Sequence, residues 1–521
     1  MAHVDKLIVT NLSALTKKYG AATKRITDAV KQLVAADKQR GLRSQLLALD
    51  DTAAMGAIKA PPVTTPGNQR QGKAAIDGVC HALTPDYVVI LGSVDVVPQQ
   101  QLKNPMYHKD GDDDRLVPSD LPYACEAPYS TQCRDFRGPT RIVGRLPDLT
   151  GETDPSYLVG LLKTAATYAR RPRSQYADYF GLSAQIWEES TALSLKNTFG
   201  AASDLQLVPP KDFKWPASLL RRRAHFINCH GAPGDAFFYG QPASGADEYP
   251  EAHSAKYLKG RITQGTVVAA ECCYGAELYP PRVAQGQAGI CNTYLEQTAY
   301  GFFGSSTIAY GPSSGNGEAD YICQFFLQEM LAGASLGRAA LEARQKFVQW
   351  VTILDPHNLK TLAQFNFMGD PSIHPVAPTP HGLSQGKSYK KTFPAAETLP
   401  AGRGLRRQKL VRNGLGLSEM VAAVRPAPRL RPRGKVRQAL EAAARESKLR
   451  NVQLVSFVAD DPAKGLYRRA KLAQVGGSQV HVAFGTQRVT GHDQPRVTRA
   501  VAVLATVQDG EIVRLRRLHS R

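Results

Sequence analysis

The stretch Val267–Glu277, VVAAECCYGAE, runs from four small apolar residues directly into a glutamate, two adjacent cysteines and a Tyr-Gly pair. An uninterrupted apolar run bounded by polar and turn-forming residues is typical of a strand that is buried on both faces, as in a parallel sheet. The stretch AHFINCHG at 224–231 has the same character and ends in His-Gly. The sequence therefore predicts two buried strands, one followed by a histidine and the other by a cysteine.

Strand and helix signals alternate on both sides of these two stretches. Apolar strand patterns occur at 6–11, 86–98 and 301–310, and helical spacing of apolar residues occurs at 22–41 and along 319–351. Alternation of this kind favours a mostly parallel sheet covered by helices, so the predicted class is α/β.

Composition shifts divide the chain into four predicted parts. Residues 1–165 form an N-terminal α/β half and residues 166–380 a second one. Residues 381–434 are rich in Pro, Gly and Arg and are expected to be a largely extended or disordered basic linker. Residues 435–521 combine one amphipathic helix with four or five alternating strands, which predicts a small α+β domain.

The overall composition is that of a folded, soluble protein. The 521 residues are 43% hydrophobic and 21% charged. No run approaches the roughly 18 apolar residues of a membrane span, and no secretory signal is apparent, so a cytoplasmic location is expected. Because no secretory signal is apparent, we expect the eight cysteines to be reduced. None of them forms a CxxC pair, so no zinc site is expected, and no cofactor is expected either. The acidic run Asp110–Asp114 lacks the glycine and distal glutamate of a calcium loop and is expected to be solvated.

The positive charge is concentrated at one end of the chain. Residues 401–521 contain 25 Lys and Arg against 8 Asp and Glu, a net of +17 out of +20 for the whole protein. Such asymmetry is consistent with a basic appendage that binds an anionic partner such as nucleic acid, and equally with a solvated basic surface.

The chemistry of interest is expected where the two buried strands end. In open parallel sheets, sites lie at the carboxyl ends of strands, which selects His230 and the Cys272–Cys273 pair. An imidazole can take the proton of a thiol, and the following Gly231 permits a sharp turn. Successive side chains alternate in direction, so only one of the two cysteines can face His230. A lone cysteine or histidine on an apolar strand is more often a core residue. The catalytic interpretation is favoured because a histidine and a cysteine occur together at the ends of two such strands.

These features together resemble the caspase-like cysteine peptidases, and most closely the gingipain-like group (peptidase family C25). The supporting stretches are the His-Gly and Cys-x-x-Gly strand ends, YVVILGSVDVVP, RIVGRLP, GFFGSSTIAYG and FNFMGDPSIHP, spread over about residues 5–376. The resemblance implies a six-stranded caspase-like αβα sandwich with an N-terminal α/β half beside it. Its Cys-x-x-Gly pattern assigns the nucleophile to Cys272, although Glu271 stands where relatives commonly have alanine.

The resemblance also implies roles for individual residues. His230 would be the general base and acid, Cys272 would form the acyl-enzyme, and the N–H groups of Gly231 and Cys272 would hold the oxyanion. Glu188 and Glu189 are candidates to bind an Arg or Lys side chain of a protein substrate, or they merely cap the following helix. Tyr310 would form an aromatic pocket wall, or is ordinary core packing. The predicted function is a cytosolic cysteine endopeptidase that cleaves after Arg or Lys. The alternative is a catalytically silent scaffold whose basic C-terminal region binds nucleic acid.

Overall fold

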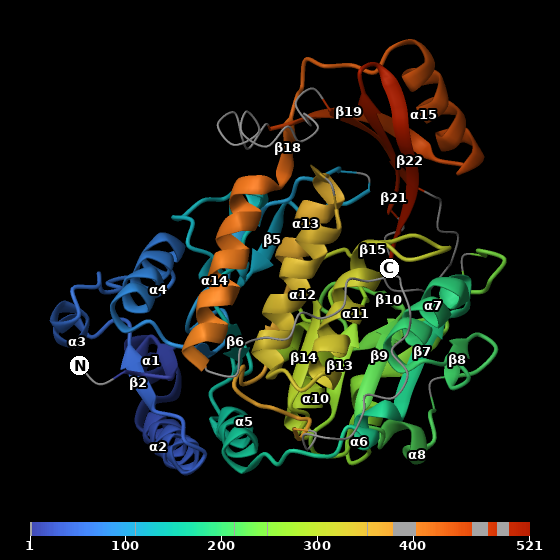
Figure 1. The fold of residues 1–521 in the computed structure, drawn as a ribbon. Helices are drawn as coiled ribbons and strands as arrows, with labels where there is room; N and C mark the ends of the chain where they lie inside the picture. Colours follow the sequence, from blue (N-terminus) through green and yellow to red (C-terminus); the bar gives the residue numbers. More distant parts are fainter. Residues whose placement is uncertain are drawn as a thin grey trace.

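A ten-stranded sheet forms the centre of the molecule (Figure 1). The computed structural model describes residues 3–109, 111–212, 214–246, 248–351, 353–378, 403–460, 478–486 and 500–521. The spatial order of the strands is β2 (Ser44–Ala48), β1 (Lys6–Thr10), β3 (Tyr87–Leu91), β6 (Val143–Leu146), β17 (Phe365–Met368), β14 (Gly301–Ser305), β13 (Val267–Ala270), β9 (Ala224–Asn228), β7 (Tyr179–Ala184) and β8 (Leu205–Val208).

Neighbouring strands of this sheet are parallel everywhere except at one pair. Strands β14 and β17 run antiparallel, with Phe303 opposite Phe367, and all other neighbours are parallel. The mostly parallel sheet predicted from the alternating apolar runs is therefore confirmed. The two predicted halves share one continuous sheet, in which β6 of the first half pairs in parallel with β17 of the second.

Helices cover both faces of the sheet. Tyr294 of α10 (Ile290–Glu296) hydrogen-bonds His225 of β9, whereas Thr191 of α7 (Glu188–Phe199) accepts a hydrogen bond from Asn228. Residues 225 and 228 have opposite parity on a strand, so the two helices lie on opposite faces. Helix α10 contacts α5 (Ser156–Thr167), and α7 contacts α11 (Glu318–Leu331), which packs on α12 (Leu336–Trp350).

Further helices and small strands complete this part of the chain. The remaining helices are α1 (Leu12–Tyr19), α2 (Thr23–Gln39), α3 (Thr52–Ala57), α4 (Gln69–Leu83), α6 (Ser174–Ala177), α8 (Ala217–Leu220), α9 (Ala255–Leu258) and α13 (Pro356–Gln364). Small strands are β4 (Gln100–Lys103), β5 (Leu116–Ser119), β10 (His230–Gly231), β11 (Phe237–Tyr239) and β12 (Glu251–Ser254). In the described ranges, no helix has both the length and the apolar character needed to cross a bilayer.

The C-terminal region builds a second sheet above the first one (Figure 1). Its strands are β18 (Ala422–Pro426), β19 (Arg450–Ala459), β20 (Gln479–Thr486), β21 (Ala500–Gln508) and β22 (Glu511–Ser520), with α15 (Gly434–Glu446) packed on β20 and β21. The strand patterns read in the sequence are present. Instead of an extended linker, residues 403–426 form helix α14 (Arg403–Met420), which packs on α12, followed by β18. Residues 381–402 of the predicted linker lie outside the described residues.

Two short strands connect the C-terminal sheet to the main body. Strand β15 (Tyr310–Gly311) pairs with β22, and β16 (Ile353–Leu354) pairs with β18. Both follow elements of the main body directly, because β15 comes after β14 and β16 comes after α12. The end of the C-terminal strand is thus held beside the edge of the main sheet where β14 ends.

The acidic run 110–114 departs from the sequence expectation. Asp112 is fully buried, forms an ion pair with the buried Lys360, and accepts a hydrogen bond from Tyr310 at 3.0 Å. Burial raises the pKa of Asp112 to about 6, and Lys360 opposes this rise. The expectation of a solvated loop is wrong at this residue, because its partner cation comes from α13, 248 residues later in the chain. Asp110 lies outside the described residues.

Candidate active site

The ends of β9 and β13 lie side by side, as the sequence predicts. The backbones of the following segments approach so closely that a Cβ atom on Gly231 would lie 1.9 Å from the carbonyl oxygen of Cys273. Real Cβ atoms do not reach that distance, so this position requires glycine. The histidine of one strand end and the cysteines of the next are therefore neighbours at the same edge.

His230 is buried in an aromatic setting. Its side chain is 1% exposed, and its Nε2 lies 2.9 Å from Oε1 of Gln241. The ring packs against Trp187 with 4.3 Å between centroids and against Tyr249 with 5.0 Å. These contacts fix the plane of the imidazole, which is what a residue that transfers protons at one atom requires.

The two cysteines have different surroundings. The Cys272 sulfur accepts a hydrogen bond from the Cys229 N–H at 3.3 Å, so it faces the end of β9. The Cys273 sulfur accepts a hydrogen bond from the Ala309 N–H at 3.2 Å, so it faces the segment that leads into β15. Burial raises the pKa of both thiols, that of Cys272 well above its ordinary value and that of Cys273 to about 12. Either sulfur is therefore protonated at rest and needs a base to become a nucleophile.

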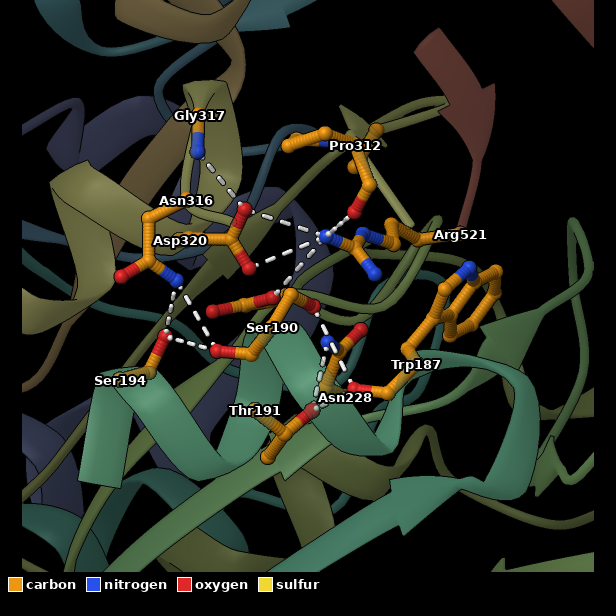
Figure 2. A network of polar contacts seen from close by, with 12 residues as sticks. Trp187, Ser190, Thr191, Ser194, Asn228, Pro312, Asn316, Gly317, Asp320 and Arg521 are labelled. Atoms are coloured by element: carbon orange, nitrogen blue, oxygen red, sulfur yellow. Dashed lines mark hydrogen bonds and ion pairs between the residues drawn. The ribbon is translucent and has the colours of Figure 1, made fainter. Parts of the chain in front are cut away.

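A buried arginine packs on the same indole as the histidine, and no local sequence pattern marks this arginine. The Arg521 Nη2 donates to Asp320 at 3.0 and 3.1 Å and to the Pro312 carbonyl at 3.1 Å, as Figure 2 shows. The same nitrogen is 3.9 Å from Glu271. The guanidinium carbon lies 4.7 Å from the centre of the Trp187 ring, the indole that also contacts His230. We call the set Trp187, Glu271, Pro312 and Asp320 the arginine site.

The electrostatics of the arginine site suit one cation. Burial raises the pKa of Glu271 well above its ordinary value, the neighbouring Asp320 carboxylate raises it further, and Arg521 opposes both. Burial likewise raises the pKa of Asp320, and Arg521 lowers it. Two buried carboxylates this close favour sharing one proton, which leaves a single negative charge opposite the guanidinium. A neutral side chain would leave that charge unpaired, so the site selects a cation.

The backbone that carries Arg521 is bound as an added strand. The Arg521 N–H donates to the Ala309 carbonyl at 2.9 Å. Ser520 pairs with Tyr310 and His519 with Gly311 in antiparallel register. His519 also lines a cavity of about 590 Å3, together with Gln185, Trp187, Glu188, Glu189, Gln241 and Ser313. We call this space the rim cavity.

The other residues predicted from sequence take positions around this strand. Glu188 and Glu189 are exposed in the first turn of α7 and line the rim cavity, while the buried arginine is held by Glu271 and Asp320. Tyr310 contributes its backbone to the paired strand. Its side chain is 1% exposed and packs edge-on against His357 at 4.8 Å. The position of Glu271 at a strand end was a visible signal, whereas Asp320 and Arg521 carried none.

Outside this site, one cluster among the residues that the structure describes has the composition of a metal centre. His3, Asp5 and Asp86 place one ligand atom each within 4.8 Å of one another. Both carboxylates already face arginines, Asp5 being 3.3 Å from Arg43 and Asp86 being 3.7 Å from Arg407. These pairs account for the negative charge of the cluster, and it lies on the N-terminal half away from His230.

Comparisons with known proteins give only remote likenesses. A solved structure described as "Structure of Protease" matches over 100% of this chain and 98% of its own length, with 12% identity and a TM-score of 0.44. The structure of the Saccharomyces cerevisiae separase–securin complex matches over 45% of this chain and 14% of that chain, with 12% identity and a TM-score of 0.24. No family model and no curated protein matches the chain. Both TM-scores are too low to support a functional assignment.

Proposed function

We propose that the protein is a caspase-like, gingipain-related cysteine endopeptidase that cleaves protein substrates after Arg or Lys. One observation carries the proposal: a guanidinium, bound by buried carboxylates and attached to an extended backbone, lies beside the histidine and cysteine strand ends. The strands from β17 to β8 are six, the number in the sandwich that the sequence motifs imply, and β17 runs antiparallel to β14. All eight cysteines are free, which favours a reducing compartment such as the cytosol.

The chemistry follows from the groups at the strand ends. His230 accepts the thiol proton while the sulfur attacks the substrate carbonyl carbon, which forms a C–S bond and an oxyanion. N–H groups of Gly231 and Cys272 are the proposed donors to that oxyanion. The protonated His230 then gives its proton to the leaving amine as the C–N bond breaks. Water hydrolyses the thioester with His230 again as base, which releases the carboxylic acid and restores the thiol.

The proposal leaves two sulfurs to be distinguished by experiment. The Cys-x-x-Gly pattern assigns the nucleophile to Cys272. The contact between Cys273 and Ala309 places Cys273 beside the residue whose carbonyl binds the Arg521 backbone. Because both thiols have raised pKa values, the sulfur that reacts is the one whose proton His230 can reach in the complex.

Labelling by an arginine-derived acyloxymethyl ketone tests the function. We expect one label per chain in the wild type and none in His230→Ala, with the site located by mass spectrometry of digested protein. Loss of labelling in Cys272→Ala or in Cys273→Ala alone identifies the nucleophile, and Cys291→Ala, a buried cysteine of α10, is the matched control.

Two results would contradict the peptidase. The first is labelling that persists in both single cysteine variants and in His230→Ala. The second is an absence of labelling in every form, which would favour the silent scaffold with an anionic partner. If a peptide library cleaved by the wild type prefers Asp or Leu before the cut, the basic specificity is wrong.

A further inference from the structure

The last residues of β22 occupy the place where a substrate of the proposed peptidase has to lie. We infer that residues 518–521 bind along β15 as a substrate-like segment, with Arg521 in the arginine site, and that they block the site until β22 is displaced. This inference rests on the proposed function, and it adds the regulation of the same site and the sequence preference of its substrates.

The backbone geometry is that of a bound peptide rather than of a packed loop. An extended segment that adds to a short edge strand satisfies its own N–H and C=O groups independently of its side chains, which is a general mode of peptide recognition. Here the added strand is His519–Arg521 and the edge is Ala309–Gly311. Any other extended peptide would need the same edge, so binding by the segment and by a substrate exclude one another.

The side chains of the segment fit as a specific ligand does. Leu518, Ser520 and Arg521 are each 1% exposed. A Cβ atom on Gly311 would lie 2.1 Å from the Arg521 Nη2, so the guanidinium passes through space that only a glycine leaves open. A long cationic side chain in a buried site with two carboxylates and an indole is the arrangement expected for recognition of arginine.

The rest of β22 holds the segment in this place. Arg516 forms ion pairs with Glu318 and Asp355, two buried carboxylates of the main body. Strand β22 pairs with β21 from Val501 to Gln508, so the segment belongs to a folded sheet. A tethered ligand has an effective concentration on the order of mM, so even a weak ligand in this position would keep the site filled.

The bound segment also indicates which substrates fit. Arg521 lies in the arginine site, and a small residue precedes it at the buried Ser520 position. The position of His519 faces the rim cavity with Glu188 and Glu189, so a basic or polar residue is favoured there. Preferred substrates would therefore be extended segments with a basic residue, a small residue and an arginine in succession.

Hydrolysis of a peptidyl-arginine aminocoumarin amide by the full chain tests the block. Arg521→Ala empties the arginine site, and we expect kcat/KM to rise about ten-fold or more. The reason is that the apparent affinity of the wild type for substrate is its intrinsic affinity multiplied by the fraction of molecules in which the segment is displaced. Arg517→Ala is the matched control, since Arg517 lies on the same strand but is 41% exposed and pairs with Glu446. Equal kcat/KM in wild type and Arg521→Ala would overturn the inference while leaving the peptidase intact.

A binding measurement keeps the test independent of catalysis. The peptide Leu-His-Ser-Arg should bind Arg521→Ala in calorimetry and should not bind the wild type, whereas Leu-His-Ser-Ala should bind neither. If Arg521→Ala does not fold, amide exchange of residues 518–521 in the wild type provides the answer. We expect that exchange to rise when the arginyl ketone labels the protein, and unchanged exchange in fully labelled protein would refute displacement. Peptide binding without any hydrolysis or labelling would refute the peptidase and the block, and would leave only a peptide site.

Discussion

Asp320→Asn separates the charge of the arginine site from its shape. The two Asp320 oxygens accept hydrogen bonds from the Arg521 Nη2 at 3.0 and 3.1 Å, and one of them also accepts from the Gly317 N–H at 3.0 Å. The asparagine oxygen can still cap the start of α11, so the substitution removes a negative charge with little change in local structure. The experiment is done in the Arg521→Ala background, where the arginine site is empty and residues 518–520 have lost the contacts of the guanidinium.

The magnitude follows from the contacts that change. A hydrogen bond to a charged group contributes about 1.5–3 kcal/mol. Glu271 limits the loss, because removal of the neighbouring carboxylate lowers its pKa and lets it ionise opposite the guanidinium at 3.9 Å. We therefore expect a loss of about 2 kcal/mol, which is about 30-fold in kcat/KM for a substrate with arginine before the cut.

The assay compares an arginyl substrate with its citrulline analogue, which has nearly the same shape and no charge. Asp320→Asn should reduce kcat/KM for arginine and change it less than about three-fold for citrulline, since a neutral side chain gains little from the carboxylate. An equal loss for both substrates would show that Asp320 acts through the structure of α11, and the electrostatic reasoning would then be wrong.

Three further outcomes are expected. Burial raises the pKa of Glu277 to about 7, so the folded protein binds more protons than the unfolded one, and its stability falls as the pH rises from about 4.5 to 7. Glu277→Gln should remove this fall and be up to about 3 kcal/mol more stable than wild type at pH 8, and identical pH profiles in denaturant unfolding would contradict this prediction. Asp112→Asn removes the carboxylate that pairs with the buried Lys360 and should lower the free energy of unfolding in urea by about 3–5 kcal/mol. A decrease below about 1 kcal/mol would argue against a buried ion pair. Gly231→Ala forces a Cβ against the Cys273 carbonyl, so it should abolish ketone labelling and lower the free energy of unfolding by about 1–3 kcal/mol. Labelling of this variant at the wild-type level would refute the close approach of the two backbones.

The sequence determined the elements and their class because the signals for them are local. The apolar runs at 224–228 and 267–270 are buried strands, as their composition predicts, and they bring His230 and Cys272 to one edge of the sheet. Parallel neighbours place their carboxyl ends together, so this part of the site could be predicted from spacing alone. Helix α11 ends at Leu331, and Gly333 follows with a φ of +89°, in the left-handed region that favours glycine.

Only the tertiary structure decided which charged residues meet. Asp320 lies on a helix and Arg521 at the end of a strand 201 residues later, and neither position differs in local pattern from a solvated residue. Glu188 and Glu189 were the acidic candidates because the resemblance implies an acidic residue at this point of the chain that binds a basic side chain, yet the buried cation is held by Glu271 and Asp320. Long-range ion pairing depends on the path of the whole chain, and periodicity carries no information about it. The sequence therefore determined a mostly parallel α/β sheet with a histidine and a cysteine at its edge, and the tertiary structure alone placed Arg521 of the same chain against Asp320, Glu271 and Trp187.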